Sequence, residues 1–168
     1  MKVKSAMVIG ASGLVGREIV KLLLKTPDVE NVTTFVRRDS GLKQYDHFGK
    51  MQEHQVEFDR VTNWAQLLTG DTLFSAMGTT LKSAGSEEAQ YKVDYQYQWD
   101  VAHAARKNGC RTYVLISAAG ANPQSQFFYP RMKGELETDI RFLAFPNLRI
   151  LRPGRLGGDR KTIRGESR

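Results

Sequence analysis

Short apolar runs alternate along the chain with segments in which apolar residues recur every three to four positions. Six runs have the length and composition of buried strands, at residues 7–9, 32–36, 56–58, 72–76, 112–117 and 148–151. Helical spacing follows the first run from Leu14 onward and extends again over residues 87–107. This alternation predicts an α/β fold with a doubly wound parallel sheet, in a single domain over residues 1–168.

Three glycines lie between the first strand and the first helix. Gly10, Gly13 and Gly16 have G-x-x-G-x-x-G spacing, which suits a Rossmann-like turn that holds a diphosphate at a helix N-terminus. A nucleophile elbow is excluded because Leu14 stands where its second glycine is required. A Walker-type phosphate loop is excluded because Arg17 follows Gly16. An ordinary strand-to-helix turn is the alternative interpretation.

Two arginines follow the second predicted strand. A carboxylate at this place accepts the ribose hydroxyls of NAD, whereas an arginine favours the 2′-phosphate of NADP. Here the strand is followed by Arg37 and Arg38, and Asp39 comes one position too late. The pair predicts a preference for NADP(H) over NAD(H); two solvated surface arginines are the alternative.

The segments around the third and fourth predicted strands contain fewer residues that indicate a function. Residues 40–55 are polar, have no period and are predicted to form a loop. Asp59, after the run at 56–58, either faces the adenine edge or caps the next helical turn. Small residues at 77–80 suit a ligand that lies across the strand ends, or a plain turn.

A serine, a tyrosine and a lysine lie at the end of the fifth strand and the start of the next helix. Ser117 ends the strand, and Pro130 suits the first helical position, so Tyr129 and Lys133 should share one face. Reduction of a carbonyl needs a proton donor, and an ammonium beside a phenol lowers the phenol pKa. We expect Tyr129 to transfer the proton, Lys133 to assist it and to hold the nicotinamide ribose, and Ser117 to orient the substrate oxygen.

The long helix over residues 87–107 contains a cluster of aromatic residues. The cluster consists of Tyr91, Tyr95, Tyr97 and Trp99, which we expect to pack against the sheet or against a partner subunit in a homodimer. Asp94, in the same helix, is expected to order a loop.

Charge and composition argue against nucleic-acid binding, a membrane span and a metal site. Most of the net charge of +7 lies in residues 148–168, where no aromatic residue is interleaved, so we expect no nucleic-acid partner. The apolar runs are too short for a membrane span, and no long apolar signal core is present, which predicts a cytoplasmic protein. Cys110 is the only cysteine and the histidines lack ligand spacing, so no metal site is expected.

Taken together, these residues resemble the short-chain dehydrogenase/reductase superfamily, in its atypical branch with the NmrA-like and Tat-interacting-protein-like NADPH-binding proteins. The resemblance covers residues from about 5 to 160 and includes the glycine turn, the arginine pair, residues 77–80, Lys133-Gly134-Glu135 and residues 151–154. It implies contacts to the diphosphate from Gly10, Ser12, Gly13, Leu14 and Val15, to the 2′-phosphate from Arg37 and Arg38, and to the adenine from Asp59. It further implies contacts to the ribose from Ala76, Met77 and Gly78, passage by the nicotinamide of Pro153 and Gly154, and a catalytic set of Ser117, Tyr129 and Lys133.

Two departures separate the chain from this pattern. Relatives continue past the sixth strand, so the substrate segment is expected to be short, missing or supplied by a partner. No asparagine is recognisable at the helix position of a fourth catalytic residue. Our first hypothesis is an NADP(H)-dependent oxidoreductase for a small carbonyl or alcohol. The second is a non-catalytic NADP(H)-binding regulator that acts through a protein partner, and the third is a scaffold without cofactor.

Overall fold

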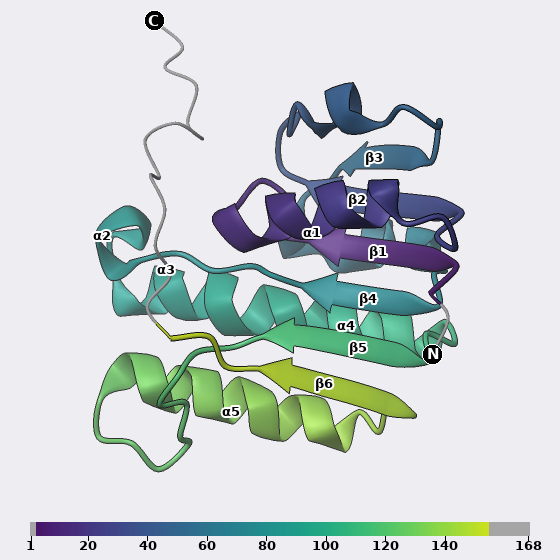
Figure 1. Cartoon of the computed structure of the whole chain (residues 1–168). Coiled ribbons are helices and arrows are strands. Elements are labelled where there is room, and N and C mark those ends of the chain that lie inside the picture. The colour runs from purple at the N-terminus through teal and green to yellow at the C-terminus, as the bar shows by residue number, and fades with distance from the viewer. Residues whose placement is uncertain (1–2, 155–168) are drawn as a thin grey trace, which may run out of the picture.

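A parallel sheet of six strands forms the centre of the protein, seen in a computed structural model that describes residues 3–154 (Figure 1). The strand order is β3-β2-β1-β4-β5-β6, and all neighbouring strands are parallel. The strands are β1 (Ser5–Ile9), β2 (Asn31–Val36), β3 (Met51–Gln55), β4 (Thr72–Ser75), β5 (Thr112–Ile116) and β6 (Asn147–Leu151). The order reverses between β1 and β4, which is where doubly wound sheets bind ligands. The predicted Rossmann-like class is confirmed.

Helices connect the strands. The α-helices are α1 (Leu14–Lys25), α2 (Leu81–Ala84), α3 (Glu87–Tyr91), α4 (Tyr97–Lys107) and α5 (Phe128–Phe142). Short turns of 3₁₀-helix are η1 (Leu42–Tyr45), η2 (Phe58–Asn63) and η3 (Ala65–Leu67), and η4 (Lys92–Gln96) is a turn of π-helix. The predicted helix over residues 87–107 is therefore present, but it is widened in its middle by one π-helical turn. No helix within residues 3–154 is long and apolar enough to cross a bilayer.

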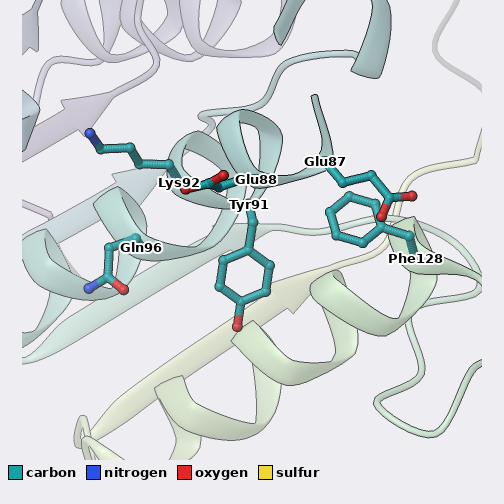
Figure 2. Close-up of a pocket in the computed structure, with 6 residues that line it drawn as sticks. All are labelled: Glu87, Glu88, Tyr91, Lys92, Gln96 and Phe128. Carbon is teal, nitrogen blue, oxygen red and sulfur yellow. The ribbon is translucent and has the colours of Figure 1, made fainter. Parts of the chain in front are cut away.

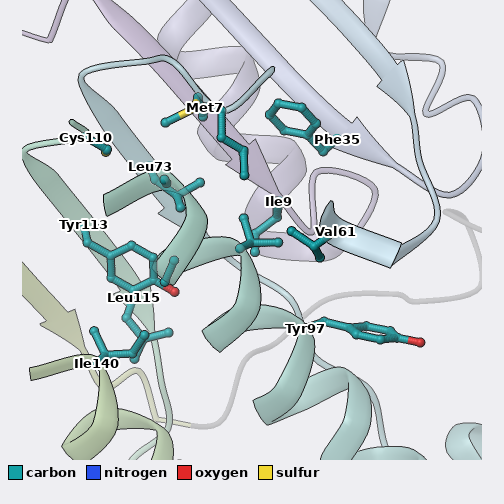
Figure 3. Close-up of a cluster of buried hydrophobic side chains, with 14 of the residues drawn as sticks. Met7, Ile9, Phe35, Val61, Leu73, Tyr97, Cys110, Tyr113, Leu115 and Ile140 are labelled. Atoms are coloured by element: carbon teal, nitrogen blue, oxygen red, sulfur yellow. The ribbon is translucent and has the colours of Figure 1, made fainter. Parts of the chain in front are cut away.

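Two hydrophobic clusters cover the two faces of the sheet. Successive side chains of a strand point to opposite faces, so Ala6 and Val8 belong to one cluster and Met7 and Ile9 to the other. The helix α1 packs on the first face, and the helices α4 and α5 contribute to the second. Figure 3 shows this second cluster, in which the buried Tyr113 of β5 lies among residues of the sheet and helices.

The third strand lies elsewhere than predicted. It comprises Met51–Gln55, within the expected loop, while the run at residues 56–58 leads into the 3₁₀-helix η2. Because β3 is one of the two edge strands, it pairs only with β2 in the sheet, and its side chains are largely polar. An edge strand can form on backbone pairing with little apolar side chain, which is why hydrophobic pattern misses it.

The helix α5 begins two residues earlier than predicted. Phe127 is its N-cap, so Pro130 is the third helical residue rather than the first. Proline is tolerated there because the first four N–H groups of a helix have no intrahelical partner. The Asn122 N–H donates to the Pro130 carbonyl at 2.9 Å, which packs the loop before the helix onto its first turn.

Gly134, in the middle of α5, is where this loop makes its closest approach. A Cβ on Gly134 would lie 2.2 Å from the Pro123 nitrogen and 2.3 Å from the Asn122 carbonyl carbon. A glycine in the middle of a helix lowers the stability of that helix. The structure explains why glycine stands at position 134, because the preceding loop leaves no space there for a side chain.

We predict that Gly134→Ala destabilises the protein although alanine favours helix by about 1 kcal/mol. The added methyl meets backbone atoms that cannot move away singly, and such overpacking costs about 1–3 kcal/mol. Urea unfolding of the variant and the wild type measures the difference. A higher free energy of unfolding for the variant would contradict this account.

Candidate functional site

The glycine turn brings the ends of β1 and β4 into backbone contact. Gly10 has a φ of +78°, and a Cβ on it would lie 2.4 Å from the Ala76 carbonyl carbon. A Cβ on Gly16 would lie 2.1 Å from the Gly10 carbonyl oxygen, and the Gly13 N–H donates to that oxygen at 3.0 Å. The first and third glycines are thus required by the fold, as the spacing predicts.

The N-terminus of α1 is open to a ligand. Gly13 is the N-cap and provides no side-chain hydrogen bond, and the first turn, from Leu14 and Val15 onward, contains no acidic residue. Ser12 and Gly13 are exposed. Uncapped N–H groups and the positive end of the helix dipole suit a diphosphate. The predicted diphosphate residues therefore fit a dinucleotide at this turn.

The two arginines lie where the sequence predicts, directly after β2. Arg37 and Arg38 are exposed and follow Val36, which ends the strand beside β1. The Asp39 carboxylate accepts the Gly41 N–H at 2.7 Å and so is engaged in its own turn. The strand end therefore presents two guanidinium groups and one carboxylate, and the carboxylate is held in the turn.

Asp59 is not at a strand end. It lies in η2, where its carboxylate forms an ion pair with Lys92. The hydrogen bond to the Lys92 ammonium lowers the pKa of Asp59, and both groups are solvent-exposed. Its predicted contact with adenine stays a prediction, and the structure gives the carboxylate a partner within the chain.

Three side chains of the long helix hold the segment after β4. Gln98 donates to the Met77 carbonyl at 3.3 Å, and Gln90 donates to the Thr79 carbonyl at 3.0 Å. Between them, Asp94 accepts the Thr79 N–H at 2.7 Å. The expectation that Asp94 orders a loop is confirmed, and the loop is the one predicted to line the ribose.

Ala76 and Gly78 belong to the same held segment. The Ala76 N–H donates to the Ile9 carbonyl at 3.0 Å, and a Cβ on Gly78 would lie 3.3 Å from the Asp94 carboxylate. The segment therefore runs from the glycine turn to Asp94, and a side chain at Gly78 would make a tight contact with the Asp94 carboxylate.

Lys133 pairs with Asp94. The Nζ–Oδ1 distance is 3.0 Å, and both side chains are almost completely buried. Burial raises the pKa of Asp94, and the Lys133 ammonium opposes this shift only in part. The same ammonium lies 5.9 Å from the centroid of the Tyr129 ring. The structure thus brings Tyr129 and Lys133 together on one face of α5 and adds a carboxylate to them.

Ser117 donates to a second buried carboxylate. Its hydroxyl lies 2.7 Å from Glu137 Oε1, and Arg152 donates to the same oxygen at 2.9 Å. Arg141 lies 3.5 Å from the other carboxylate oxygen. Burial alone would raise the pKa of Glu137, but the bonds from Arg152 and Ser117 lower it overall. The Ser117 proton is therefore directed at an ionised carboxylate.

The structure reveals polar residues that the sequence analysis missed. Glu137, Gln90 and Gln98 lie in amphipathic helices, where a charged or amide residue is typical of a solvated face. Glu137 is four residues after Lys133, on the same face of α5. That spacing from a candidate catalytic lysine was the available signal.

The remaining predicted residues lie at the same edge of the sheet. The Pro153 carbonyl, just after β6, accepts the Ala119 N–H at 3.0 Å, and Gly154 is exposed. Within residues 3–154, no group of three or more histidine, cysteine or acidic side chains is placed to hold a metal.

The aromatic cluster packs within the chain. The Tyr91 hydroxyl donates to Glu135 at 3.2 Å, and Tyr95 donates to Asp139, so both join the long helix to α5. Burial and the Glu135 carboxylate raise the pKa of Tyr91 to about 12. Contacts within the chain account for these two hydroxyls, and a homodimer stays a prediction.

A pocket of about 390 Å³ lies beside the start of α5. It is lined by Glu87, Glu88, Tyr91, Lys92, Gln96 and Phe128 (Figure 2). Tyr91 points from the long helix toward α5. Phe128 precedes Tyr129 in the chain, but none of the predicted site residues lines the pocket.

Curated relatives match nearly the whole chain. The protein named FMP52, mitochondrial, of Candida albicans is 40% identical over 166 residues, covering 96% of this chain and 71% of its own length. The Aspergillus fumigatus protein of that name is 41% identical over 161 residues, covering 93% and 68%. These names overturn the cytoplasmic location expected above, because that expectation considered only secretory signals and membrane spans, which do not report on mitochondrial import.

Solved structures of low sequence identity share the fold. A UDP-glucose 4-epimerase of Thermotoga maritima superposes with a TM-score of 0.70 at 15% identity, over 88% of this chain and 54% of its own. A short-chain dehydrogenase/reductase superfamily protein of Agrobacterium tumefaciens, with bound NAD, gives 0.69 at 19%, over 88% and 48%. The chain thus spans about half the length of these structures.

The family model described as NAD(P)H-binding matches residues 10–164, from the first glycine of the turn past the end of β6. Because this match covers more than half of the chain, the chain belongs to the family described as NAD(P)H-binding, in agreement with the fold and the open glycine turn.

Proposed function

We propose that the protein is an NADP(H)-dependent oxidoreductase that transfers hydride to or from a small carbonyl or alcohol. The observation that carries the proposal is the buried Lys133 ammonium, 5.9 Å from the ring centroid of Tyr129 at the edge of the sheet that bears the glycine turn. When bound, the nicotinamide would supply or accept the hydride. Tyr129, whose side chain is half-exposed, would give or take the proton.

The polar partners within the site support the roles that we propose for Lys133 and Ser117. An ammonium has three donors, so Lys133 can bond to Asp94 and still donate to a ribose hydroxyl and to the Tyr129 oxygen. Ser117 donates to Glu137, and its Oγ therefore offers lone pairs to a substrate. A hydroxyl of an alcohol substrate suits such an acceptor, which leaves Tyr129 as the proton donor toward a carbonyl.

The proposed preference for NADP(H) depends on the end of β2. Arg37 and Arg38 are exposed there, and the Asp39 carboxylate already accepts a backbone N–H. A 2′-phosphate is attracted by two guanidinium groups, whereas the ribose hydroxyls of NAD(H) would lack the usual carboxylate acceptor. The names of the curated relatives make a mitochondrial location part of this proposal.

The second candidate function is a non-catalytic NADP(H)-binding regulator. The observation that favours it is that candidate catalytic groups are engaged internally, Ser117 with Glu137 and Lys133 with Asp94. Buried, fully paired charges fix the ends of the strands whether or not a substrate is present. A cofactor-dependent contact with a protein partner would then replace turnover.

NADPH is expected to stabilise the protein more than NADH does. A ligand at 100 times its Kd raises the free energy of unfolding by about 2.7 kcal/mol, so thermal unfolding with each nucleotide compares their affinities. The double variant Arg37→Ala/Arg38→Ala should lose most of the stabilisation by NADPH and keep that by NADH. Equal stabilisation by both nucleotides would refute the preference, and none by either would favour a scaffold without cofactor.

Tyr129→Phe is expected to abolish reduction of small aldehydes and ketones while leaving NADPH affinity nearly unchanged. Loss of a positioned proton donor costs about 10²–10⁴-fold in rate. Consumption of NADPH, followed by absorbance across a substrate panel, measures it. The matched control Tyr91→Phe removes a tyrosine hydroxyl bonded to α5 outside the site and should keep activity. Unchanged turnover in Tyr129→Phe would remove Tyr129 from the mechanism.

A further inference from the structure

A third arginine lies against the loop that follows the arginine pair. Arg17, in α1, donates from Nη1 to the Ser40 carbonyl at 3.4 Å, and Ser40 is two residues after Arg38. The Arg17 Cζ also lies 6.0 Å from the centroid of the Tyr45 ring. The guanidinium is therefore held near the end of β2, although Arg17 belongs to α1, the helix that follows the glycine turn.

The loop that accepts the hydrogen bond from Arg17 is held by Glu53 of β3. Glu53 accepts the Ser40 N–H at 3.1 Å and the Thr34 hydroxyl at 3.2 Å, and it also accepts the Ser40 hydroxyl. The carboxylates of Glu53, in β3, and Asp39, in the loop, are thus engaged by donors of the loop and strand. Within residues 3–154, neither Arg17 nor Arg37 nor Arg38 forms an ion pair, so no carboxylate of that part of the chain balances these three guanidinium groups directly.

Arg17 lies between the two parts of the expected nucleotide site, the glycine turn and the end of β2. The backbone N–H of Arg17 donates to the carbonyl of Gly13, the N-cap of α1, at 3.0 Å. Arg17 therefore belongs to the first turns of the helix that is expected to face the diphosphate. A dinucleotide in this fold extends its adenosine half from that turn toward the end of β2. The backbone of Arg17 thus lies in the first turns of α1, and its guanidinium reaches Ser40 in the loop after β2.

Lys21, one helical turn further, provides a comparison on the same surface. Its ammonium lies 4.8 Å from the centroid of the same Tyr45 ring, but it forms an ion pair with Glu18 at 2.8 Å. The charge of Lys21 is therefore balanced within α1, whereas that of Arg17 is not. The two cations share a neighbour and differ in what they can offer to an anion.

We propose that Arg17 is a specificity-determining residue that donates to the 2′-phosphate of NADP(H) together with Arg37 and Arg38. This inference rests on the proposed preference for NADP(H). The planar guanidinium can keep its contact with Ser40 and still present further N–H donors to a phosphate. Arg17 so links recognition of the 2′-phosphate to the helix that binds the diphosphate.

Isothermal titration of the wild type, Arg17→Ala and Lys21→Ala with NADPH and with NADH tests the proposal. Arg17→Ala should weaken NADPH binding about tenfold or more, the loss expected for one charge-assisted hydrogen bond, and should change NADH binding by less than about twofold. Arg17→Lys should recover part of the NADPH affinity because it restores the charge. Lys21→Ala should bind both nucleotides as the wild type does.

The outcomes separate this proposal from the one on which it rests. If the wild type prefers NADPH and Arg17→Ala keeps that preference, Arg17 does not read the phosphate. A loss of the same size for NADPH and NADH would assign Arg17 a role in holding the loop at Ser40 instead. If the wild type binds both nucleotides equally, the preference for NADP(H) itself is wrong, and the proposed role of Arg17 fails with it.

Discussion

The buried ion pair of Asp94 and Lys133 connects the parts of the site to one another. Asp94 comes from the π-helical turn between α3 and α4, Lys133 comes from α5, and the other carboxylate oxygen of Asp94 binds the backbone after β4. A buried charge without its partner costs about 3–5 kcal/mol, so these three segments keep their places together. One carboxylate thereby positions both the segment predicted to line the ribose and the predicted catalytic lysine.

A second carboxylate, Glu137, has the same function for the last two strands. Ser117 after β5 and Arg152 after β6 both donate to it, and Glu137 is one helical turn after Lys133 on α5. The helix α5 is therefore attached to the strand ends by two buried carboxylate contacts rather than by apolar packing alone. This attachment fixes the N-terminal turn of α5, where Tyr129 lies, relative to the glycine turn.

Much of the fold could be predicted because buried parallel strands have continuous apolar sequences. β1, β2, β4 and β5 are largely buried and have such runs, and the edge strand β6 contains the apolar residues Leu148, Ile150 and Leu151. The glycines of the turn have backbone requirements that other residues cannot meet. The edge strand β3 could not be found in this way, because Glu53 and its polar neighbours pair through the backbone and bind a loop that the sequence does not place.

The site residues were predictable to the extent that their chemistry depends on local spacing. Tyr129 and Lys133 are four residues apart in one helix, so their shared face follows from the helix alone. Asp94, the partner of Lys133, is 39 positions away in the sequence, and Glu137, the partner of Ser117, is 20 positions away. The pattern of an amphipathic helix predicts that a lone Asp or Glu is exposed to solvent. Which carboxylate becomes buried is decided by how the helices pack on the sheet.

The internal pairing restricts the chemistry that the site can perform. Ser117 has one proton and gives it to Glu137, so a substrate carbonyl can receive a hydrogen bond only from another donor of the site. Among the predicted catalytic residues, the Tyr129 phenol is the proposed proton donor, because the Lys133 ammonium lies 5.9 Å from its ring centroid and a cation beside a phenol favours the phenolate. The oxidoreductase and regulator hypotheses therefore differ in one physical event, transfer of the Tyr129 proton to a substrate.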